Sequence, residues 1–559
     1  MRMLVGLVIA GVCLMACKSS FEEAPSAPVN TITISTPSGA LEGVRDGETH
    51  IFRAIPYAMP PTGDRRWRAP EPMPAWDGIR QAKTAGPACF QPPRAPGVYY
   101  TELPPMSEDC LVLDVTAPAG ASNAPVIVWI HGGTLIWGSS QSDRYAGHEF
   151  TKRGAILVSI NYRLGPLGYL AHPELSAESA DDVSGNYGLL DQVAALDWIR
   201  QNISAFGGDS GNVTIFGESA GALSVELLMA SPNAQGLFHK AIIQSGYLYT
   251  MPELRAARNE LPSAEDIGAY FAEQLGAGDI ATLRGMEGEA LTNQMIEAGY
   301  VPAGTVDGRI LKRQLVETFD LGEQAPVPLI AGFNSGEIRS LRGLLPPLPD
   351  SAAAYEEDIR ARYGDLADRY LEFYPPGDDA DETRLNATRD VIFTWGIERM
   401  VRQQAAIGQP SYMYYFTHSY LAADEAGVSA FHAIEIPYVF GNLDQTSAHW
   451  PAIPDTAEER ALSESLIDYW TSFAHTGTPS SANGPAWETF ATDEAYMEFA
   501  AVPRAGNHLM PGVHELHEEI VCRRRRSGTQ SWDWRAGSIA PPLPDDDDSG
   551  TCERNVKVD

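Results

Sequence analysis

The 559-residue sequence is poor in basic residues, with 40 lysines and arginines against 73 acidic residues and a formal net charge of −33. This charge repels a phosphate backbone, so nucleic acid is excluded as a partner. A cationic substrate would be attracted, although an acid-rich, soluble surface accounts for the same charge. Charged residues make up 20% and hydrophobic residues 44% of the chain, a balance that excludes disorder and predicts a globular protein.

Long hydrophobic runs are missing after the N-terminus, where Arg2 and the apolar run at 4–14 predict an export signal. The run closes on Leu-Met-Ala-Cys, a pattern typical of a bacterial lipoprotein, in which Cys17 is lipidated. An ordinary signal peptide cut nearby is the alternative. We expect either secretion or a lipoprotein of the bacterial periplasm or outer membrane, with signal 1–17, linker 18–30 and membrane contact only through the lipid.

Cysteine is also scarce. Six are present, and two of them, Cys13 and Cys17, fall in the signal. An exported protein can form disulfides, and the four remaining cysteines allow three pairings. Loop closure favours sequence neighbours, hence Cys89 with Cys110 and, less strongly, Cys522 with Cys552. Neither a CxxC motif nor a Cys/His cluster occurs, so no metal is expected.

Short apolar segments alternate with helical patterns through the rest of the chain. Strand-like runs include TITIST, PVIVWI, AILVSI, NVTIF, KAIIQS and PLIAGF, and a helical pattern covers GLLDQVAALDWIRQN. Strands separated by helices favour parallel pairing, which predicts an α/β fold with a large, mostly parallel central sheet. Helix-rich stretches at about 250–325 and 338–420 are predicted insertions that cap the sheet. We expect one domain over 31–522 and a tail of surface chain or partial disorder over 523–559.

Gly217-Glu218-Ser219-Ala220-Gly221 lies between the strand NVTIF and the helical segment ALSVELLMA. A GxSxG motif in this context is typical of a nucleophile elbow, in which the serine hydroxyl is exposed at a strand-to-helix turn. The alternative is a glycine turn with a capping serine. We predict that Ser219 is a nucleophile.

A serine nucleophile needs an oxyanion hole, a base and an acid. His131-Gly132-Gly133 follows the strand PVIVWI and predicts backbone donors, with Ala220 adding another N–H group, although the same residues could form a plain strand-ending turn. Among twelve histidines, His432 lies downstream of what we take as the last sheet strand and is the predicted base. The acid should lie between Ser219 and His432, where Glu337 fits but spacing alone does not choose it.

These motifs resemble the type-B carboxylesterase and cholinesterase family, including its bacterial para-nitrobenzyl-esterase-like members, over about 29–490. The resemblance rests on FRAIPYAMPP, SEDCLVLDV, NYRLGPLGYL, FGESAGA, GFNSGE and FHAIEIPYVFG. It implies an α/β-hydrolase fold whose insertions cap an active-site gorge. It also implies a triad of Ser219, Glu337 and His432, a Cys89–Cys110 loop over the gorge, and no cofactor.

Two positions depart from the family pattern. Thr134 stands after Gly133 where the family usually has a third glycine. We expect backbone N–H donors from Gly133, Thr134 and Ala220. The Thr134 donor is weaker if the loop requires a positive φ, which a branched residue resists. Gly336 stands where many relatives carry Asp, which we expect to change only local hydrogen bonding.

The predicted function is hydrolysis of small or medium neutral carboxylic esters by a serine carboxylesterase. Tyr100 occupies the position of a cation-binding aromatic in cholinesterases, and acidic Glu218 lies beside the nucleophile, so a choline ester is an alternative substrate. A lipase and a non-catalytic binding protein of the same fold are further alternatives. The expected partner is therefore a small-molecule ester.

Overall fold

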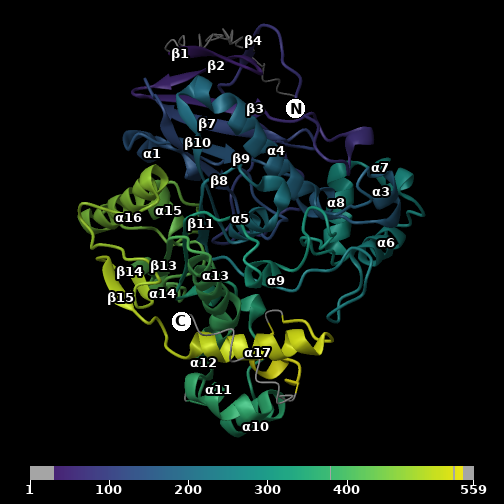
Figure 1. Cartoon of the computed structure of the whole chain (residues 1–559), viewed down its shortest axis with the longest axis vertical. Coiled ribbons are helices and arrows are strands. Elements are labelled where there is room, and N and C mark those ends of the chain that lie inside the picture. The colour runs from purple at the N-terminus through teal and green to yellow at the C-terminus, as the bar shows by residue number, and fades with distance from the viewer. Residues whose placement is uncertain (1–29, 378, 533–534, 545–559) are drawn as a thin grey trace, which may run out of the picture.

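The computed structural model describes residues 30–377, 379–532 and 535–544. Most strands within these ranges belong to one large mixed sheet (Figure 1). The strands are β1 (Thr31–Thr36), β2 (Gly39–Asp46), β3 (Thr49–Pro56), β4 (Ile79–Gln81), β5 (Ala88–Cys89), β6 (Met106–Ser107), β7 (Val112–Pro118), β8 (Ala124–Ile130), β9 (Ile156–Ile160), β10 (Gly208–Glu218), β11 (Lys240–Gln244), β12 (Leu329–Asn334), β13 (Ser411–Phe416), β14 (Ala495–Phe499) and β15 (Arg504–Asn507).

The sheet has the order β1-β2-β3-β7-β9-β8-β10-β11-β12-β13-β14-β15, and β4 pairs with β2. Strands from β9 through β8, β10, β11, β12 and β13 to β14 are parallel, whereas both ends of the sheet are antiparallel. The parallel block is formed by the apolar runs, as expected for strands buried on both faces. The carboxyl ends of its strands therefore meet at one edge, where loops can assemble a site.

Helices cover both faces of the sheet. They are α1 (His148–Lys152), α2 (Gly165–Tyr169), α3 (Pro173–Glu178), α4 (Tyr187–Asn202), α5 (Ala220–Ala230), α6 (Ala264–Gln274), α7 (Ile280–Arg284), α8 (Gly288–Glu297), α9 (Leu315–Asp320), α10 (Ala352–Tyr363), α11 (Ala367–Phe373), α12 (Ala380–Arg389), α13 (Trp395–Ala406), α14 (Leu421–Glu425), α15 (Ile436–Phe440), α16 (Ala457–Thr476) and α17 (Val513–Ser527). A π-helical turn, Asp390–Thr394, joins α12 to α13.

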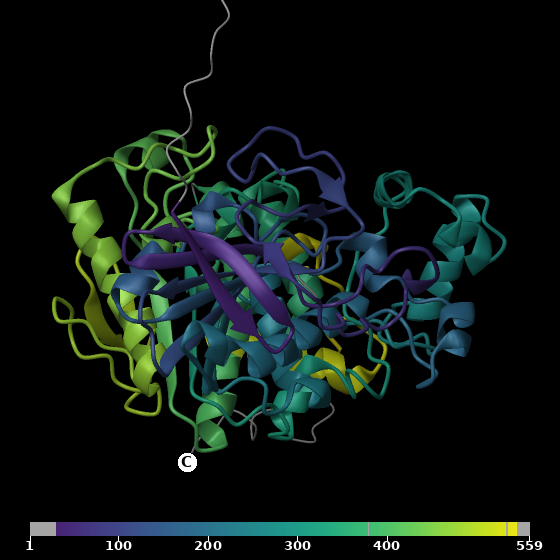
Figure 2. The same cartoon turned by 90° about the horizontal axis from the view of Figure 1, so that it is seen from above.

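Side-chain alternation along β8 divides the core into two layers. Val126, Val128 and Ile130 pack with residues of α4, α5, α9 and α13. Ile127 and Trp129 point to the other face and pack with residues of α1, α15 and α16. Seen from above, α16 lies at one side of the molecule and α6 to α8 at the opposite side (Figure 2).

Strand β13 corrects the expectation that the sheet ends with β12. The segment SYMYYF lies inside the stretch predicted as helical, and it pairs in parallel with β12. Four of its six residues are aromatic and both of its faces are buried, so the segment lacks the polar alternation that marks a half-buried strand. The second predicted insertion is therefore interrupted by the sheet.

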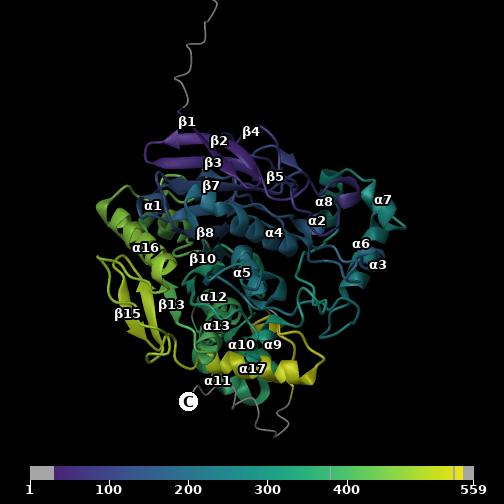
Figure 3. The same ribbon diagram turned by 45° about the horizontal axis from the view of Figure 1, so that its top comes forward.

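The predicted tail also needs correction, because α17 runs through the boundary at 522 to Ser527. Leu516 and Ile520 pack in a cluster with tyrosines of α10 and α11. Arg524 is 1% exposed, and Arg523 pairs with Asp365 at 2.7 Å. The run of arginines has no apolar periodicity, so its sequence does not predict a helix. The helix is stabilised instead by burial of the aliphatic parts of the arginine side chains and by their ion pairs. Figure 3 shows α17 at the end of the molecule where α9, α10 and α11 lie.

Cys89 and Cys110 are joined by a disulfide, the pairing that loop closure favours. Cys522 is also disulfide-bonded. Its predicted partner Cys552, and the predicted lipidation site Cys17, lie outside the described residues. Across the described ranges, helices are too short or too polar to cross a membrane.

Candidate active site

Ser219 lies at the turn between β10 and α5 with φ 57° and ψ −122°, a strained conformation for a residue with a side chain. The flanking positions must be glycine because a side chain at either one would collide with the neighbouring backbone. A Cβ on Gly217 would lie 2.4 Å from the Gly221 carbonyl carbon, and one on Gly221 would lie 2.0 Å from the carbonyl oxygen of Ile130. The motif thus brings β10, α5 and the end of β8 into close contact around Ser219.

Glu337 and His432 form a buried pair in the connections that follow the neighbouring strands β12 and β13. Glu337 Oε2 lies 2.5 Å from His432 Nδ1, and Glu337 is completely buried. Its other oxygen accepts hydrogen bonds from the Ser245 hydroxyl at 2.6 Å and from the Asn334 backbone N–H at 2.8 Å. These bonds fix the carboxylate, so it can hold the imidazole in one tautomer and orientation.

A backbone contact joins the loops that carry these two residues. The Gly336 N–H donates to the Ala430 carbonyl at 2.8 Å, and Gly336 bridges to Phe431. A Cβ on Gly336 would lie 2.8 Å from the same Ala430 oxygen. The departure at Gly336 therefore affects packing as well as hydrogen bonding, because a side chain has no room there.

The outer nitrogen of His432 lies beside Glu218. His432 Nε2 is 3.0 Å from Glu218 Oε1, and within the described chain no hydrogen bond joins His432 to the Ser219 hydroxyl. Burial lowers the pKa of His432, but the carboxylates of Glu218 and Glu337 outweigh it and raise the pKa well above 6.5. Catalytic hydrogen bonds of free enzymes are often long and tighten with substrate. The imidazole thus lies between two carboxylates beside the elbow.

Glu435 is a third buried carboxyl that sequence reasoning missed. It accepts hydrogen bonds from Asn334 Nδ2 at 2.6 Å and Gln244 Nε2 at 3.1 Å. Burial, followed by the charges of Glu218 and Glu337, raises its pKa to about 7. Its place three residues after His432 in FHAIE was the available signal, but a lone glutamate on a helix-like segment is usually solvent-exposed.

The loop after β8 supplies backbone donors near Ser219. A Cβ on Gly132 would lie 3.2 Å from Ser219 Cβ, so the loop touches the elbow. The backbone N–H groups of Gly133, Thr134 and Ala220 have no hydrogen-bond acceptor among the described residues. Thr134 adopts φ 57° despite its branched side chain. The altered loop therefore keeps two free donors, which join that of Ala220 in α5, at a cost in backbone strain.

These residues open into a cavity of about 680 Å³. Gly133, Thr134, Ser219 and His432 line it, whereas Glu337 lies behind His432. The loop 91–106, inside the Cys89–Cys110 disulfide, forms one wall, and residues 340–344 with 392–393 form another. No residue of 250–325 lines this cavity; α6 to α8 of that stretch lie at one side of the molecule, and α9 packs against α5 and α13.

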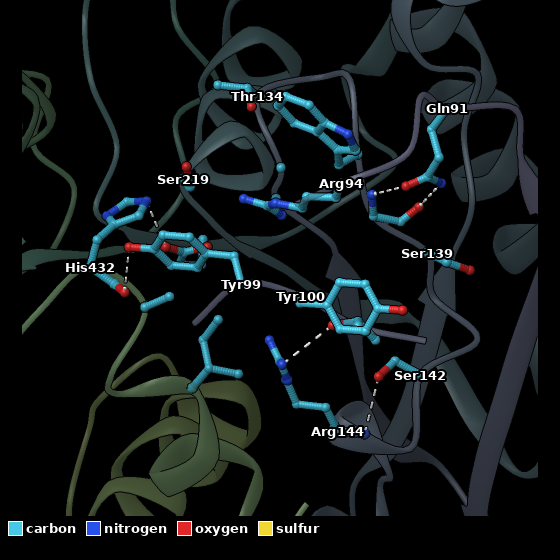
Figure 4. A pocket seen from close by; sticks show the side chains of 18 of the residues that line it. Gln91, Arg94, Tyr99, Tyr100, Thr134, Ser139, Ser142, Arg144, Ser219 and His432 are labelled. Carbon is cyan, nitrogen blue, oxygen red and sulfur yellow. Dashed lines mark hydrogen bonds and ion pairs between the residues drawn. The ribbon is translucent and has the colours of Figure 1, made fainter. Parts of the chain in front are cut away.

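The two adjacent tyrosines of the 91–106 loop have different neighbours. Tyr99, which sequence reasoning did not select, donates a 3.3 Å hydrogen bond to the His432 carbonyl, and its ring lies edge-on to the imidazole at 6.2 Å. Tyr100 lines the cavity farther from Ser219, against His449 at 6.0 Å (Figure 4). In a Tyr-Tyr pair, only the loop's conformation decides which ring faces the site.

Comparison with known proteins agrees with this geometry. The model of the carboxylesterase family matches residues 30–512. Para-nitrobenzyl esterase of Bacillus subtilis (strain 168) is 36% identical over 468 residues, covering 81% of this chain and 92% of the relative. Fumonisin B1 esterase of Sphingopyxis macrogoltabida is 35% identical over 498 residues, covering 85% and 87%. The chain belongs to the carboxylesterase family.

Solved structures show the same relation. A PNB esterase structure superposes with a TM-score of 0.74 at 32% identity, covering 87% of this chain and 99% of the esterase chain. The α/β-hydrolase fold is therefore confirmed, and its large mixed sheet has a parallel central block with antiparallel strands at both ends. As a member of this family, the protein is a carboxylic ester hydrolase that acts on small-molecule esters.

Proposed function

We propose that the protein hydrolyses small or medium-sized carboxylic esters through an acyl-enzyme on Ser219. The observation that carries this proposal is the meeting of a strained serine elbow, a buried Glu337–His432 pair and three free backbone donors at one cavity. This arrangement is the one that acyl transfer by serine requires.

In the first half of the proposed reaction, His432 Nε2 leaves Glu218 and accepts the proton of the Ser219 hydroxyl as Oγ attacks the ester carbonyl. Glu337 stabilises the imidazolium through Nδ1–H. The backbone N–H groups of Gly133, Thr134 and Ala220 donate to the oxyanion. His432 then protonates the leaving alkoxide, and the alcohol departs. In the second half, His432 takes a proton from water, which attacks the acyl-enzyme, and then returns that proton to Ser219 Oγ as the bond to the acyl group breaks and the acid is released.

The test combines active-site labelling with turnover. We expect a fluorophosphonate probe to label Ser219, detected by mass spectrometry, and the same preparation to hydrolyse short p-nitrophenyl esters. Ser219→Ala should lose the label and more than about 10⁴-fold of kcat. Ser142→Ala, which changes another hydroxyl lining the cavity, should retain both. A folded protein with an unlabelled Ser219 would instead favour the non-catalytic binding protein.

A chain-length series separates this function from that of a lipase. A lipase should prefer long acyl chains presented at an interface, whereas a cavity of about 680 Å³ favours small and medium acyl groups. Rising kcat/KM beyond medium-length acyl chains would contradict the proposal.

We also propose that the protein is exported as a lipoprotein, secretion by an ordinary signal peptide being the alternative. This proposal is supported by the charged start, the apolar run and Cys17 in the sequence. Metabolic labelling with palmitate in a bacterial host should mark the wild type and leave Cys17→Ala unmarked. Equal labelling of both would contradict it.

A further inference from the structure

Two arginines, Arg94 and Arg144, line the cavity without a carboxylate partner among the described residues. Arg94 is half-buried and Arg144 is buried, whereas buried Arg163 is paired with Asp191 at 2.7 Å. Removing a guanidinium from water is costly unless a partner compensates. Acidic residues outnumber basic ones 73 to 40 in this chain, so two unpaired arginines in the cavity need an explanation.

Arg94 is held by aromatic rings on its flat faces. Its guanidinium carbon lies 5.2 Å from the centre of the Tyr99 ring and 5.1 Å from that of Trp137. Such stacking uses the faces of the guanidinium and leaves the N–H donors around its edge available. Figure 4 shows the side chain extending from its loop toward Ser219. Arg94 thus directs free donors into the space beside the nucleophile.

Arg144 enters the same cavity from another segment (Figure 4). It is 8% exposed, its Nε has no hydrogen-bond partner, and Nη2 reaches Thr101 Oγ1 only at 3.4 Å. The ring of Trp450 lies 5.4 Å from its guanidinium carbon. Burial, and then the charge of Arg144, lower the pKa of Arg94 against the opposing effects of Tyr99, Tyr145 and the Glu218 carboxylate. The two like charges therefore interact, and an anion between them would relieve their repulsion.

We propose that Arg94 and Arg144 bind a free carboxylate of the substrate, so that the preferred ester is a partial ester of a di- or polycarboxylic acid. This inference rests on the proposed function and identifies its substrate class. A planar carboxylate matches the paired N–H groups of a guanidinium, and partial burial strengthens the bond. The inference departs from the neutral ester expected from sequence. The same cavity is also lined by the carboxylates of Glu102 and Glu218, and Glu218 lies 3.0 Å from His432 Nε2.

The test uses a matched pair of esters. Monoethyl glutarate carries a free carboxylate, and the ethyl ester of glutaric monoamide replaces it with a neutral amide of the same shape. We expect wild-type kcat/KM to favour the carboxylate about tenfold to a hundredfold, mostly through KM. In Arg94→Met this preference should fall by a similar factor. Arg309→Met makes the same change at an exposed arginine outside the cavity and should keep the wild-type preference.

A second measurement uses binding to the unmodified protein. Glutarate should inhibit hydrolysis of the amide ester competitively, and glutaramide should inhibit it at least tenfold more weakly. Equal turnover of the two esters, or equal inhibition by the two ligands, overturns the inference and leaves the proposed function standing. A stronger preference for the ethyl ester of 4-phosphonobutanoate overturns the choice of carboxylate. Failure to hydrolyse any ester, with Ser219 unlabelled, contradicts the proposed function itself.

Discussion

His432 has a carboxylate on each side, and this arrangement has consequences for the pH dependence of the reaction. A general base must be neutral to accept the serine proton, so kcat/KM should fall as pH drops through the pKa of His432. Glu218 and Glu337 together raise that pKa well above 6.5 against the effect of burial. The acidic limb of the pH profile should therefore lie on the alkaline side of an ordinary histidine's titration.

Glu218→Gln removes one of the two charges that raise the pKa of His432. We expect the acidic limb of the kcat/KM profile for a p-nitrophenyl ester to move to lower pH, because the imidazolium loses a stabilising neighbour. Glu102→Gln removes a carboxylate from the same cavity that does not contribute to the shift at His432 and should leave the limb in place. A limb that stays fixed in Glu218→Gln would show that Glu218 does not act on the base.

At the scale of single residues, the sequence motifs identified the catalytic candidates but not the contacts that these residues make. Ser219 could be chosen because glycines, a strand and a helix surround it, and His432 because it lies downstream of the strand that we expected to end the sheet. Glu218 could not be recognised as a neighbour of His432, since the turn that aims its side chain depends on the strained φ of Ser219. Arg94 was missed because an unpaired arginine cannot be distinguished from a paired one in sequence.

The loop that follows β8 stores backbone strain in consecutive residues. Gly133, Thr134 and Leu135 all have positive φ, at 111°, 57° and 57°. The conformation is held by hydrogen bonds from the Ile136 and Trp137 N–H groups to the Gly133 carbonyl, and from the Gly165 N–H to the Leu135 carbonyl. A left-handed conformation is unfavourable for a residue with a Cβ, most of all a branched one.

Replacing Thr134 by glycine should relieve part of this strain. Thr134→Gly is expected to raise the free energy of unfolding by roughly 0.5–1 kcal/mol, the relief being reduced by the entropy of a new glycine. Thr134→Ala keeps the Cβ and should give no such gain. Urea denaturation followed by circular dichroism compares the three proteins. If alanine stabilises as much as glycine, the φ of Thr134 is not the source of the strain.

Elements were predicted well where their pattern was regular. The apolar runs predicted the strands β8 to β12, and the helical spacing of apolar residues predicted α4. Strand β13 was missed because its aromatic sequence has neither strand nor helix periodicity. Its place depends on pairing with β12, a contact made across some eighty residues that local patterns do not contain.

At the scale of the whole molecule, the folded body extends beyond the part that defines the family. The family model ends at residue 512, where α17 is about to begin. Glu518 on this helix pairs with Arg399 and accepts a hydrogen bond from Trp395 Nε1 at 2.8 Å. Past the helix, Trp532 is 3% exposed, and its backbone N–H donates to Thr250 Oγ1 at 3.0 Å.

A chain ending at residue 512 should therefore fail to fold stably, although it contains every predicted catalytic residue. The loss of α17 exposes the tyrosine cluster that packs against Leu516 and Ile520, and it leaves buried Arg399 without Glu518. Each exposed large side chain costs about 1.5–3 kcal/mol and a broken buried ion pair about 3–5 kcal/mol, against a typical total stability of about 5–15 kcal/mol. A chain ending at residue 544 keeps α17 and, although it lacks Cys552, the predicted disulfide partner of Cys522, it should retain ester turnover. The two truncations are compared by thermal unfolding and p-nitrophenyl ester hydrolysis, and an equally stable, active 512-residue chain would show that α17 is dispensable.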